Sequence, residues 1–375
     1  MNENQTKNPD NFFEIPLNVT TGDLAEEVPE IDWGQGYVKT AVGEFPRVPT
    51  SLSYTDVLGS WKARWGIGRM NYKIKPGLYA AGNPDSESHV FVTANYKMSF
   101  DRLRSELGNI DGWILVLDTK GINVWCAAGK GTFGTAELVF RAISVRLKEV
   151  ISHKKIILPQ LGAPNVSAHL VKEQTGLTVV YGPVIAKDIP AFLEARLKAT
   201  EEMRQVNFKL KDRLLVIPVE IVLSAKWGLL ICAIFFLLSG FDHGSYSIEN
   251  MVETGSISAL FIAGGFFIGT VLTPFLLPWI PVKSFALKGA VLAIDSLIIA
   301  SIFVLPQIQF QDHWMSIIAW MLIVPAISSF WAMNFTGAST FTSLSGVVKE
   351  MKVAIPLQIC FITVGFSLWL TARFI

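Results

Sequence analysis

Five long apolar stretches in the second part of the chain constrain its fold more than any other feature. They lie at about 222–241, 257–279, 286–306, 314–333 and 354–372. A helix needs roughly 17 to 25 residues to cross a hydrocarbon core about 30 Å thick, so each stretch is long enough to span a membrane. The sequence therefore predicts an all-α transmembrane domain with five spans over residues 214–375.

The distribution of charge supports this division and predicts an orientation. Of the 375 residues, 51% are hydrophobic, which is too apolar for an ordinary soluble enzyme. The loops at 242–256 and 307–313 contain no Lys or Arg, whereas the alternate connections carry Lys283, Lys288, Lys349 and Lys352. The positive-inside rule then predicts a multi-pass protein of the inner membrane with a cytoplasmic N-terminal domain. We expect no nucleic acid partner.

Single residues in the spans add two expectations. Four tryptophans lie near the predicted ends of spans, where interfacial anchors are typical: Trp227, Trp279, Trp314 and Trp369. Asp295 falls within the third span. A carboxylate is costly in lipid, so we expect Asp295 to face other helices or water.

The chain before the first span divides into two further parts. Residues 1–50 are polar and lack the apolar core of a secretory signal, so we expect a polar N-terminal extension. Residues 51–210 alternate helix-like segments with strand-like ones, such as VFVTAN at 90–95 and WILVLD at 113–118. This alternation predicts a cytoplasmic α/β domain with a mainly parallel sheet. Ligands bind at the carboxyl ends of such strands, which here are Thr93 and Asn95, 119–131, 159–164 and 181–186.

The most unusual short stretch is NVWCAAGKGTFGT at 123–135. Gly129, Gly131 and Gly134 have the G-x-G-x-x-G spacing of a dinucleotide site, but the next strand offers no acidic residue for a ribose. A P-loop needs Ser or Thr directly after Gly-Lys, and Gly131 stands there instead. The glycines therefore indicate a turn, or a place where the backbone approaches something large and flat.

Cys126 within this stretch allows two interpretations. A single cysteine is most often a small buried hydrophobic residue. Here, however, Asn123 is a good N-cap, residues 124–128 can form one apolar helical turn, and Gly129 can end it. Such a helix could lie across a planar cofactor and direct a thiolate at its centre. Cys232 and Cys360 fall within predicted spans, so neither a disulfide framework nor a C-x-x-C metal site is available.

Most of residues 65–200 resemble the corrinoid-binding domain of the corrinoid iron-sulfur protein large subunit. The resemblance rests on GRMNYKIKPGLYAAGNP at 68–84, VFVTANYKMSFDRLR at 90–104, LPQLGAPNVSAHLV at 158–171 and VVYGPVIAKDIPAFLEA at 179–195. The octapeptide at 123–130, NVWCAAGK, joined to a five-span membrane domain, resembles more closely the mercury-methylating corrinoid proteins, which are membrane-bound relatives from anaerobes.

This resemblance implies a base-off corrinoid of the cobalamin type, whose cobalt takes the Cys126 thiolate as its lower axial ligand. The implied cap over the lower face consists of Asn123, Val124, Trp125, Cys126, Ala127, Ala128, Gly129 and Lys130. Further contacts to the cofactor are implied for Thr93, Asn95, Ser99, Gly162, Tyr181, Gly182, Pro183 and Ala186.

The resemblance also implies partners and a reaction. The large subunit carries a four-cysteine iron-sulfur motif that this chain lacks, which implies no iron-sulfur cluster here and a ferredoxin-like partner with two 4Fe-4S clusters. The implied reaction is corrinoid-dependent methyl transfer to inorganic Hg(II), giving methylmercury. Methyl-tetrahydrofolate or a methyl-donor protein of the acetyl-CoA pathway would supply the methyl group. Two alternatives remain: a corrinoid methyl carrier for another acceptor, and a membrane transporter or receptor with a cytosolic ligand-binding domain.

Overall fold

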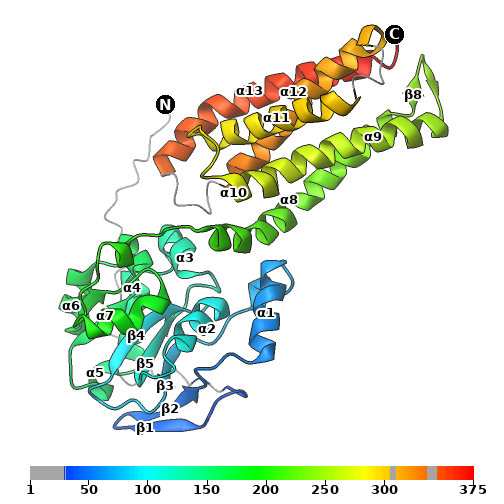
Figure 1. Cartoon of the computed structure of the whole chain (residues 1–375). Coiled ribbons are helices and arrows are strands. Elements are labelled where there is room, and N and C mark those ends of the chain that lie inside the picture. The colour runs from blue at the N-terminus through cyan, green and yellow to red at the C-terminus, as the bar shows by residue number, and fades with distance from the viewer. Residues whose placement is uncertain (1–28, 30, 305–309, 336–343) are drawn as a thin grey trace, which may run out of the picture. The chain divides into compact units, whose positions relative to one another are not determined.

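The computed structural model describes residues 29, 31–304, 310–335 and 344–375. The chain forms two compact units, which we describe separately (Figure 1). The first contains Met1–Ala63 and Ile67–Val206, and the second contains Arg64–Gly66 and Asn207–Ile375. The first unit is built on a sheet and the second is helical, which confirms the predicted fold class.

In the described part of the first unit, a seven-stranded sheet has the order β1-β2-β3-β5-β4-β6-β7. The pairs β2/β3, β5/β4, β4/β6 and β6/β7 are parallel, whereas β1/β2 and β3/β5 are antiparallel, so the sheet is mainly parallel as predicted. The strands are β1 (Tyr37–Thr40), β2 (Gly43–Val48), β3 (Gly77–Ala81), β4 (His89–Ala94), β5 (Gly112–Leu117), β6 (Lys155–Leu158) and β7 (Thr178–Tyr181).

Helices cover both faces of this sheet, because its central strands are apolar on both sides. In β5, Trp113 and Leu115 belong to one buried cluster and Ile114 to the other, as the alternation of side chains along a strand requires. The first cluster includes residues of α4 (Thr135–Ser144), α5 (Leu147–Val150) and α6 (Ala168–Thr175). The second includes residues of α2 (Lys97–Ser105) and α7 (Ile189–Glu194).

The prediction of a polar N-terminal extension is wrong where the structure shows strands, at β1 and β2. The sequence predicts a polar extension over residues 1–50, but β1 and β2 lie within that range. Phe45 and Val48 of β2 are buried in the two clusters. These strands are short and mostly polar, so only their pairing with β3 and the core shows that they belong to the sheet. Residues 1–28 and 30 lie outside the described residues.

The described part of the second unit contains five helices long and apolar enough to cross a membrane, consistent with a multi-pass membrane protein. α8 (Leu210–Leu238) begins about three turns before the predicted span and leads to a short hairpin of β8 (Phe241–Asp242) and β9 (Ser245–Tyr246). α9 (Ile248–Phe267) continues through the π-helical turn η5 (Ile268–Leu272) into α10 (Thr273–Leu276). The remaining helices are α11 (Phe285–Val304), α12 (Phe310–Asn334) and α13 (Leu344–Thr371).

Small residues allow close packing of these helices. A Cβ at Gly269 or Gly289 would lie 2.6 Å from the carbonyl oxygen of Ser328, so the backbones approach too closely for any side chain there. Lys288 donates hydrogen bonds to the carbonyls of Leu277 and Ile280, where the second span ends. A cation near the last carbonyls of a helix is stabilising. Lys288 therefore has a structural role in addition to its contribution to the positive charge of the alternate loops.

Trp369 and Asp295 have different surroundings within the helical unit. Trp369, near the end of α13, is buried, because its ring packs 4.7 Å from that of Phe235 and the Arg373 guanidinium covers it at 4.6 Å; its place at a membrane interface stays a prediction. Asp295 is exposed on the surface of α11, in line with exposed isoleucines, and not against other helices, and its contact with water stays a prediction. The rotation of a helix about its axis decides such orientations, and tertiary packing sets that rotation.

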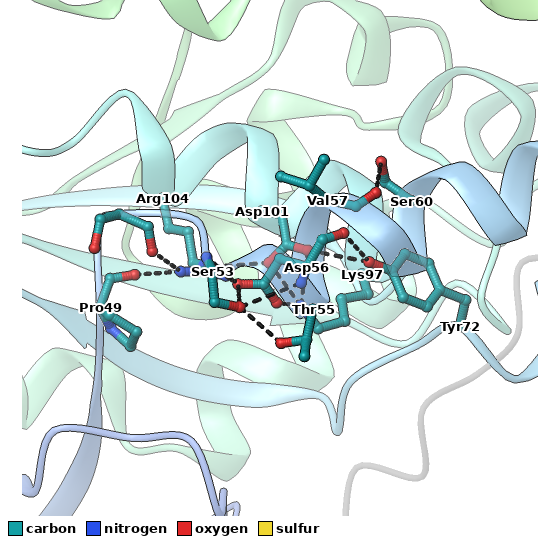
Figure 2. A network of polar contacts seen from close by, with 11 residues as sticks. Pro49, Ser53, Thr55, Asp56, Val57, Ser60, Tyr72, Lys97, Asp101 and Arg104 are labelled. Atoms are coloured by element: carbon teal, nitrogen blue, oxygen red, sulfur yellow. Dashed lines mark hydrogen bonds and ion pairs between the residues drawn. The ribbon is translucent and has the colours of Figure 1, made fainter.

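A buried ion-pair network holds α1 (Tyr54–Arg64) to α2 in the first unit (Figure 2). The fully buried Arg104 donates from Nε to Asp101 Oδ1 and from Nη2 to Asp56 Oδ2, both at 2.8 Å. Lys97 Nζ lies 2.5 Å from Asp56 Oδ1 and 2.7 Å from Asp101 Oδ2. Each carboxylate therefore meets both cations, and the ring of Trp33 lies 5.2 Å from each of the two cationic groups.

The network determines the charge of Asp56. Burial would raise the pKa of this carboxyl, but hydrogen bonds from Lys97, Ser53 and Arg104 outweigh it and hold the pKa well below its usual value of 3.8. A carboxyl whose pKa is lowered on folding stabilises the native state at pH above its unfolded pKa. That stabilisation is lost as the pH falls through the lower, folded value.

Replacing Arg104 with Met should lower the free energy of unfolding of the first unit by about 3–5 kcal/mol, because Asp56 and Asp101 would share a single buried cation. The exposed pair Lys39–Glu44 provides the control, and Lys39→Met should cost at most about 1 kcal/mol. Denaturant titration of the full chain, followed by hydrogen exchange in peptides of the sheet, measures both. Equal losses in the two variants would contradict the assigned role of Arg104.

Candidate functional site

α3 (Val124–Lys130) follows β5 at the carboxyl end of the parallel strands, and it is the short helix that the sequence predicts. Its N-cap is Asn123, whose Oδ1 accepts a hydrogen bond from the Cys126 amide at 2.9 Å. The helix ends at Gly131, which has a φ of 86°, and not at Gly129 as expected. Gly131 adopts the left-handed conformation that favours glycine at a helix end, whereas Gly129 remains within the helix.

The two faces of α3 differ. Val124, Ala127 and Ala128 are buried in the core of the first unit. The opposite face exposes Trp125, Cys126, Gly129 and Lys130. Cys126 is therefore not the small buried hydrophobic residue of the first interpretation, because its thiol lies at the surface.

Gly129 makes the exposed face of α3 flat beside the thiol. It lies three residues after Cys126 and so occupies the same side of the helix. A Cβ at Gly129 would meet no atom within 4 Å, so packing does not require glycine at this position. Glycine inside a helix costs roughly 1 kcal/mol relative to alanine. The residue is thus unfavourable for the helix, but it lets a flat group approach the backbone next to Cys126.

Asn95, directly after β4, holds the loop between β5 and α3. Its Oδ1 accepts hydrogen bonds from the backbone N–H groups of Thr119 at 3.1 Å and Gly121 at 2.9 Å, and its Nδ2 donates to Asp118 Oδ1 at 3.1 Å. Thr119 Oγ1 lies within hydrogen-bonding distance of both Asn95 Oδ1 and the Ile122 carbonyl. One buried side chain therefore organises the segment from which α3 begins.

The same loop is held from the other side by Glu137 in the first turn of α4. Glu137 accepts the Asp118 N–H at 2.8 Å and forms an ion pair with Arg141 at 2.9 Å. Burial would raise the pKa of Asp118, but hydrogen bonds from the Lys120 side chain and amide lower it overall. Asp118 and Glu137 are not among the residues that the sequence predicts for the site. Asp118 directly follows β5 and Glu137 lies in the first turn of α4, and these two positions are the sequence features that could have indicated their role in the loop.

Of the implied cofactor contacts, those on β4 and α2 point to structural roles. Thr93 is buried opposite Val116 of β5, and Asn95 is buried with its amide bonded to the loop. Ser99 is half-buried in α2. Direct contact of these residues with a cofactor stays a prediction.

The implied contacts on the later strands lie at the same edge of the sheet. Gly162 lies in the 3-10 helix η2 (Gln160–Asn165), which packs against α3, and a Cβ there would lie 2.4 Å from the Phe133 ring. The Tyr181 hydroxyl donates to the Val166 carbonyl at 2.7 Å, and the Gly182 amide donates to the Leu158 carbonyl at 2.8 Å. Pro183 is buried and Ala186 is half-buried. Of these residues, Gly162 supports α3 through η2, whereas Ala186 packs against the cluster on the other face of the sheet. Their contact with a cofactor also stays a prediction.

Comparison with known proteins bears on the first unit. Residues 68–193 match the family model of the CO dehydrogenase/acetyl-CoA synthase delta subunit. The chain is similar to the acetyl-CoA decarbonylase/synthase complex subunit gamma of Archaeoglobus fulgidus, with 30% identity over 128 residues, or 34% of this chain and 27% of the relative. The corresponding subunit of Methanocaldococcus jannaschii is 33% identical over 139 residues, or 36% of this chain and 28% of the relative.

The first unit is therefore a relative of these subunits. The Methanopyrus kandleri subunit gamma gives a similar result, with 32% identity over 125 residues, or 32% of this chain and 26% of the relative. The chain spans only about a quarter of the length of each relative. The family match ends at residue 193, before the helical unit begins.

Asn95→Ala should speed hydrogen exchange at the Thr119 and Gly121 amides, because both lose their acceptor. Asn123→Ala should instead speed exchange at the Cys126 amide and destabilise α3 by about 1 kcal/mol, the usual cost of losing an N-cap. Hydrogen-exchange mass spectrometry on the full chain, with peptides that separate 118–122 from 124–130, distinguishes the two effects. Unchanged exchange in 118–122 of Asn95→Ala would contradict the role assigned to this side chain.

Proposed function

We propose that this chain is a membrane-bound corrinoid protein that transfers a methyl group to inorganic Hg(II), giving methylmercury. The observation that carries the proposal is the exposed Cys126 thiol on the flat outer face of α3, beside Gly129. The similarity of residues 68–193 to acetyl-CoA synthase subunits supports a corrinoid-protein relative. The resemblance of NVWCAAGK to the mercury-methylating corrinoid proteins supports the more specific reaction.

The residues of α3 fit a planar cofactor. Val124, Ala127 and Ala128 anchor the helix in the core, so its outer face is held in place by packing. Gly129 leaves the surface beside the thiol open, and Trp125 and Lys130 lie on the same exposed side. In the proposed complex Cys126 would hold the cobalt of the corrinoid, and the neighbouring residues of α3 would cover the ring and exclude water from it.

A bound corrinoid would supply a cobalt atom able to carry a methyl group, and a Cys126 thiolate holding that cobalt would donate the electron density that favours transfer to a soft electrophile such as Hg(II). The contribution of the chain is to hold one sulfur at a fixed place and orientation. Asn123 fixes where the helix begins, and Asn95 fixes the loop that precedes it. Positioning of this kind is what a protein adds to the chemistry of its cofactor.

Electrons and methyl groups must come from partners. The sequence contains only three cysteines, too few for the four-cysteine ligation of an iron-sulfur cluster. We propose a ferredoxin-like protein with two 4Fe-4S clusters as the electron donor, and methyl-tetrahydrofolate or a methyl-donor protein as the methyl source. The excess of Lys in alternate loops supports a cytoplasmic location of the first unit.

A second candidate is a corrinoid methyl carrier for an acceptor other than mercury. The observation in its favour is that the curated relatives are subunits of the acetyl-CoA decarbonylase/synthase complex. The two candidates share the α3 site and differ only in the acceptor. The rate of methylmercury formation from the methylated holoprotein and Hg(II), compared with the rate from the free methylated corrinoid, separates them, since only the first candidate should exceed the free cofactor.

Cys126→Ala should abolish methyl transfer to Hg(II) and remove the sulfur-dependent feature of the corrinoid spectrum. The fold should persist, because the side chain is exposed and alanine has high helix propensity. Cys126→His should retain bound corrinoid with much lower transfer, since imidazole also binds cobalt but donates less charge. Cys360→Ala, which removes an exposed thiol on α13, is the control and should keep full transfer. Full transfer by Cys126→Ala with an unchanged spectrum would refute the proposal.

Gly129→Ala separates ligand binding from folding. The new methyl group meets no protein atom, and helix propensity predicts a gain in stability of up to about 1 kcal/mol. Because the methyl group stands on the face proposed to bind the corrinoid, affinity should fall at least about tenfold, or 1.4 kcal/mol. The matched control is Gly108→Ala, another exposed position with open space around the added Cβ. Calorimetric titration with corrinoid and thermal unfolding measure the two effects, and equal affinity in both variants would contradict the assigned face.

A further inference from the structure

Helix α1 is arranged with its apolar side outward. Asp56 and Ala63 face the interior of the first unit, and Gly59 packs so closely on the Tyr72 ring that a Cβ would lie 2.7 Å from it. The opposite side exposes four large side chains with spacing i, i+3, i+4 and i+7. These residues, here named the α1 patch, are Tyr54, Val57, Leu58 and Trp61.

The ion-pair network fixes this orientation of α1. Asp56 is bonded by Arg104 and Lys97 from α2, and its backbone carbonyl accepts a hydrogen bond from Tyr72 (Figure 2). Rotating the helix to bury the α1 patch would pull a charged carboxylate away from two buried cations, at a high cost. The patch is therefore held at the surface, with Tyr54 78% and Trp61 57% exposed.

The exposed charges in the sequence from α1 to Lys75 have one sign. Residues 54–75 contain five basic residues and a single acidic one, Asp56, which points inward to the network. Lys62 directly follows Trp61, and Lys62, Lys73 and Lys75 are exposed. Aromatic side chains beside exposed lysines are the composition of a surface that binds the headgroup region of a membrane with anionic lipids.

The first unit is joined through a short connection to a helix that is long and apolar enough to cross a membrane. Residues 207–209 are the whole connection between the first unit and α8, and three extended residues reach at most about 11 Å. α8 is the first of the five helices long and apolar enough to cross a bilayer. With α8 in a bilayer, the first unit is tethered to the membrane. The effective concentration of lipid at its surface is then higher than that of an untethered protein partner.

We propose that the α1 patch binds the bilayer interface, with Trp61 and Tyr54 in the headgroup layer and Lys62 on anionic lipid phosphates. This contact fixes which side of the first unit faces the membrane. It does not depend on the ligand bound at α3, so it stands or falls separately from the proposed function.

Spin labels on the full chain in nanodiscs, at one chain per disc, test the proposal. The label is placed at Trp61→Cys or Val57→Cys after replacement of Cys126, Cys232 and Cys360 by Ala. The control label is at Lys39→Cys, an exposed position on β1. We expect labels at 57 and 61 to collide more with oxygen, which dissolves in lipid, than with a water-soluble nickel chelate, and the label at 39 to show the reverse. Phosphatidylglycerol in the disc should strengthen this protection relative to phosphatidylcholine alone.

A second substitution separates the patch from general proximity to lipid. Trp61→Ser should weaken the protection of a label at position 57, whereas Tyr37→Ser, an exposed aromatic residue on β1, should not. Labels at 57 and 61 that remain as accessible to the nickel chelate as the label at 39, in both lipid compositions, would overturn the proposal. Protection that appears only when a ferredoxin-type protein is added would also overturn it, and would assign the patch to a protein partner.

Discussion

The hydrogen bonds of the Asn95 amide to the loop before α3 are the contacts on which the site depends. A loop at the end of buried strands has backbone groups with no strand partner, and leaving them unpaired would cost free energy. One amide side chain offers both an acceptor and donors, so it can bind Thr119, Gly121 and Asp118 together. It joins the ends of two adjacent parallel strands, β4 and β5. Where α3 begins, and hence where Cys126 lies, follows from this junction.

The short helix α3 combines a firm underside with an open outer face. Alanines and a valine face the core, η2 packs beneath, and Gly162 permits the close approach of Phe133. On the outer side, glycine stands where alanine would serve the helix better. A local choice that costs stability without a packing reason is expected at a functional site. Together these features hold one thiol on a packed helix at the surface, as the proposed contact with a planar cofactor would require.

The side chains of the two units follow different rules, which is consistent with one unit in water and one in a membrane. The helices of the second unit expose isoleucine and leucine, and hydroxyl groups such as those of Thr254, Thr270 and Ser296 donate to carbonyls one turn earlier in the same helix. The first unit buries apolar clusters on both faces of its sheet, as a domain in water does. Helix α1 departs from that rule, because its charged residue is inside and its aromatic residues are outside. The ion pairs to Arg104 and Lys97 make this arrangement stable, and they leave an apolar surface on a unit tethered to a bilayer.

Local sequence determined the five apolar helices, the mainly parallel sheet and the short helix at Asn123. The length of a span, an apolar run and a helix cap each depend on residues that are close together in the sequence. Tertiary structure decided the rest. Asp56 and Arg104 are 48 positions apart, so no periodicity could indicate their pairing. The same holds for β2, which is recognisable only beside β3, for Trp369, which packs against Phe235 of another helix, and for Asn95, whose amide bonds to the loop. Sequence patterns report which residues share a face, whereas the partner of that face is set by contacts between segments far apart in the chain.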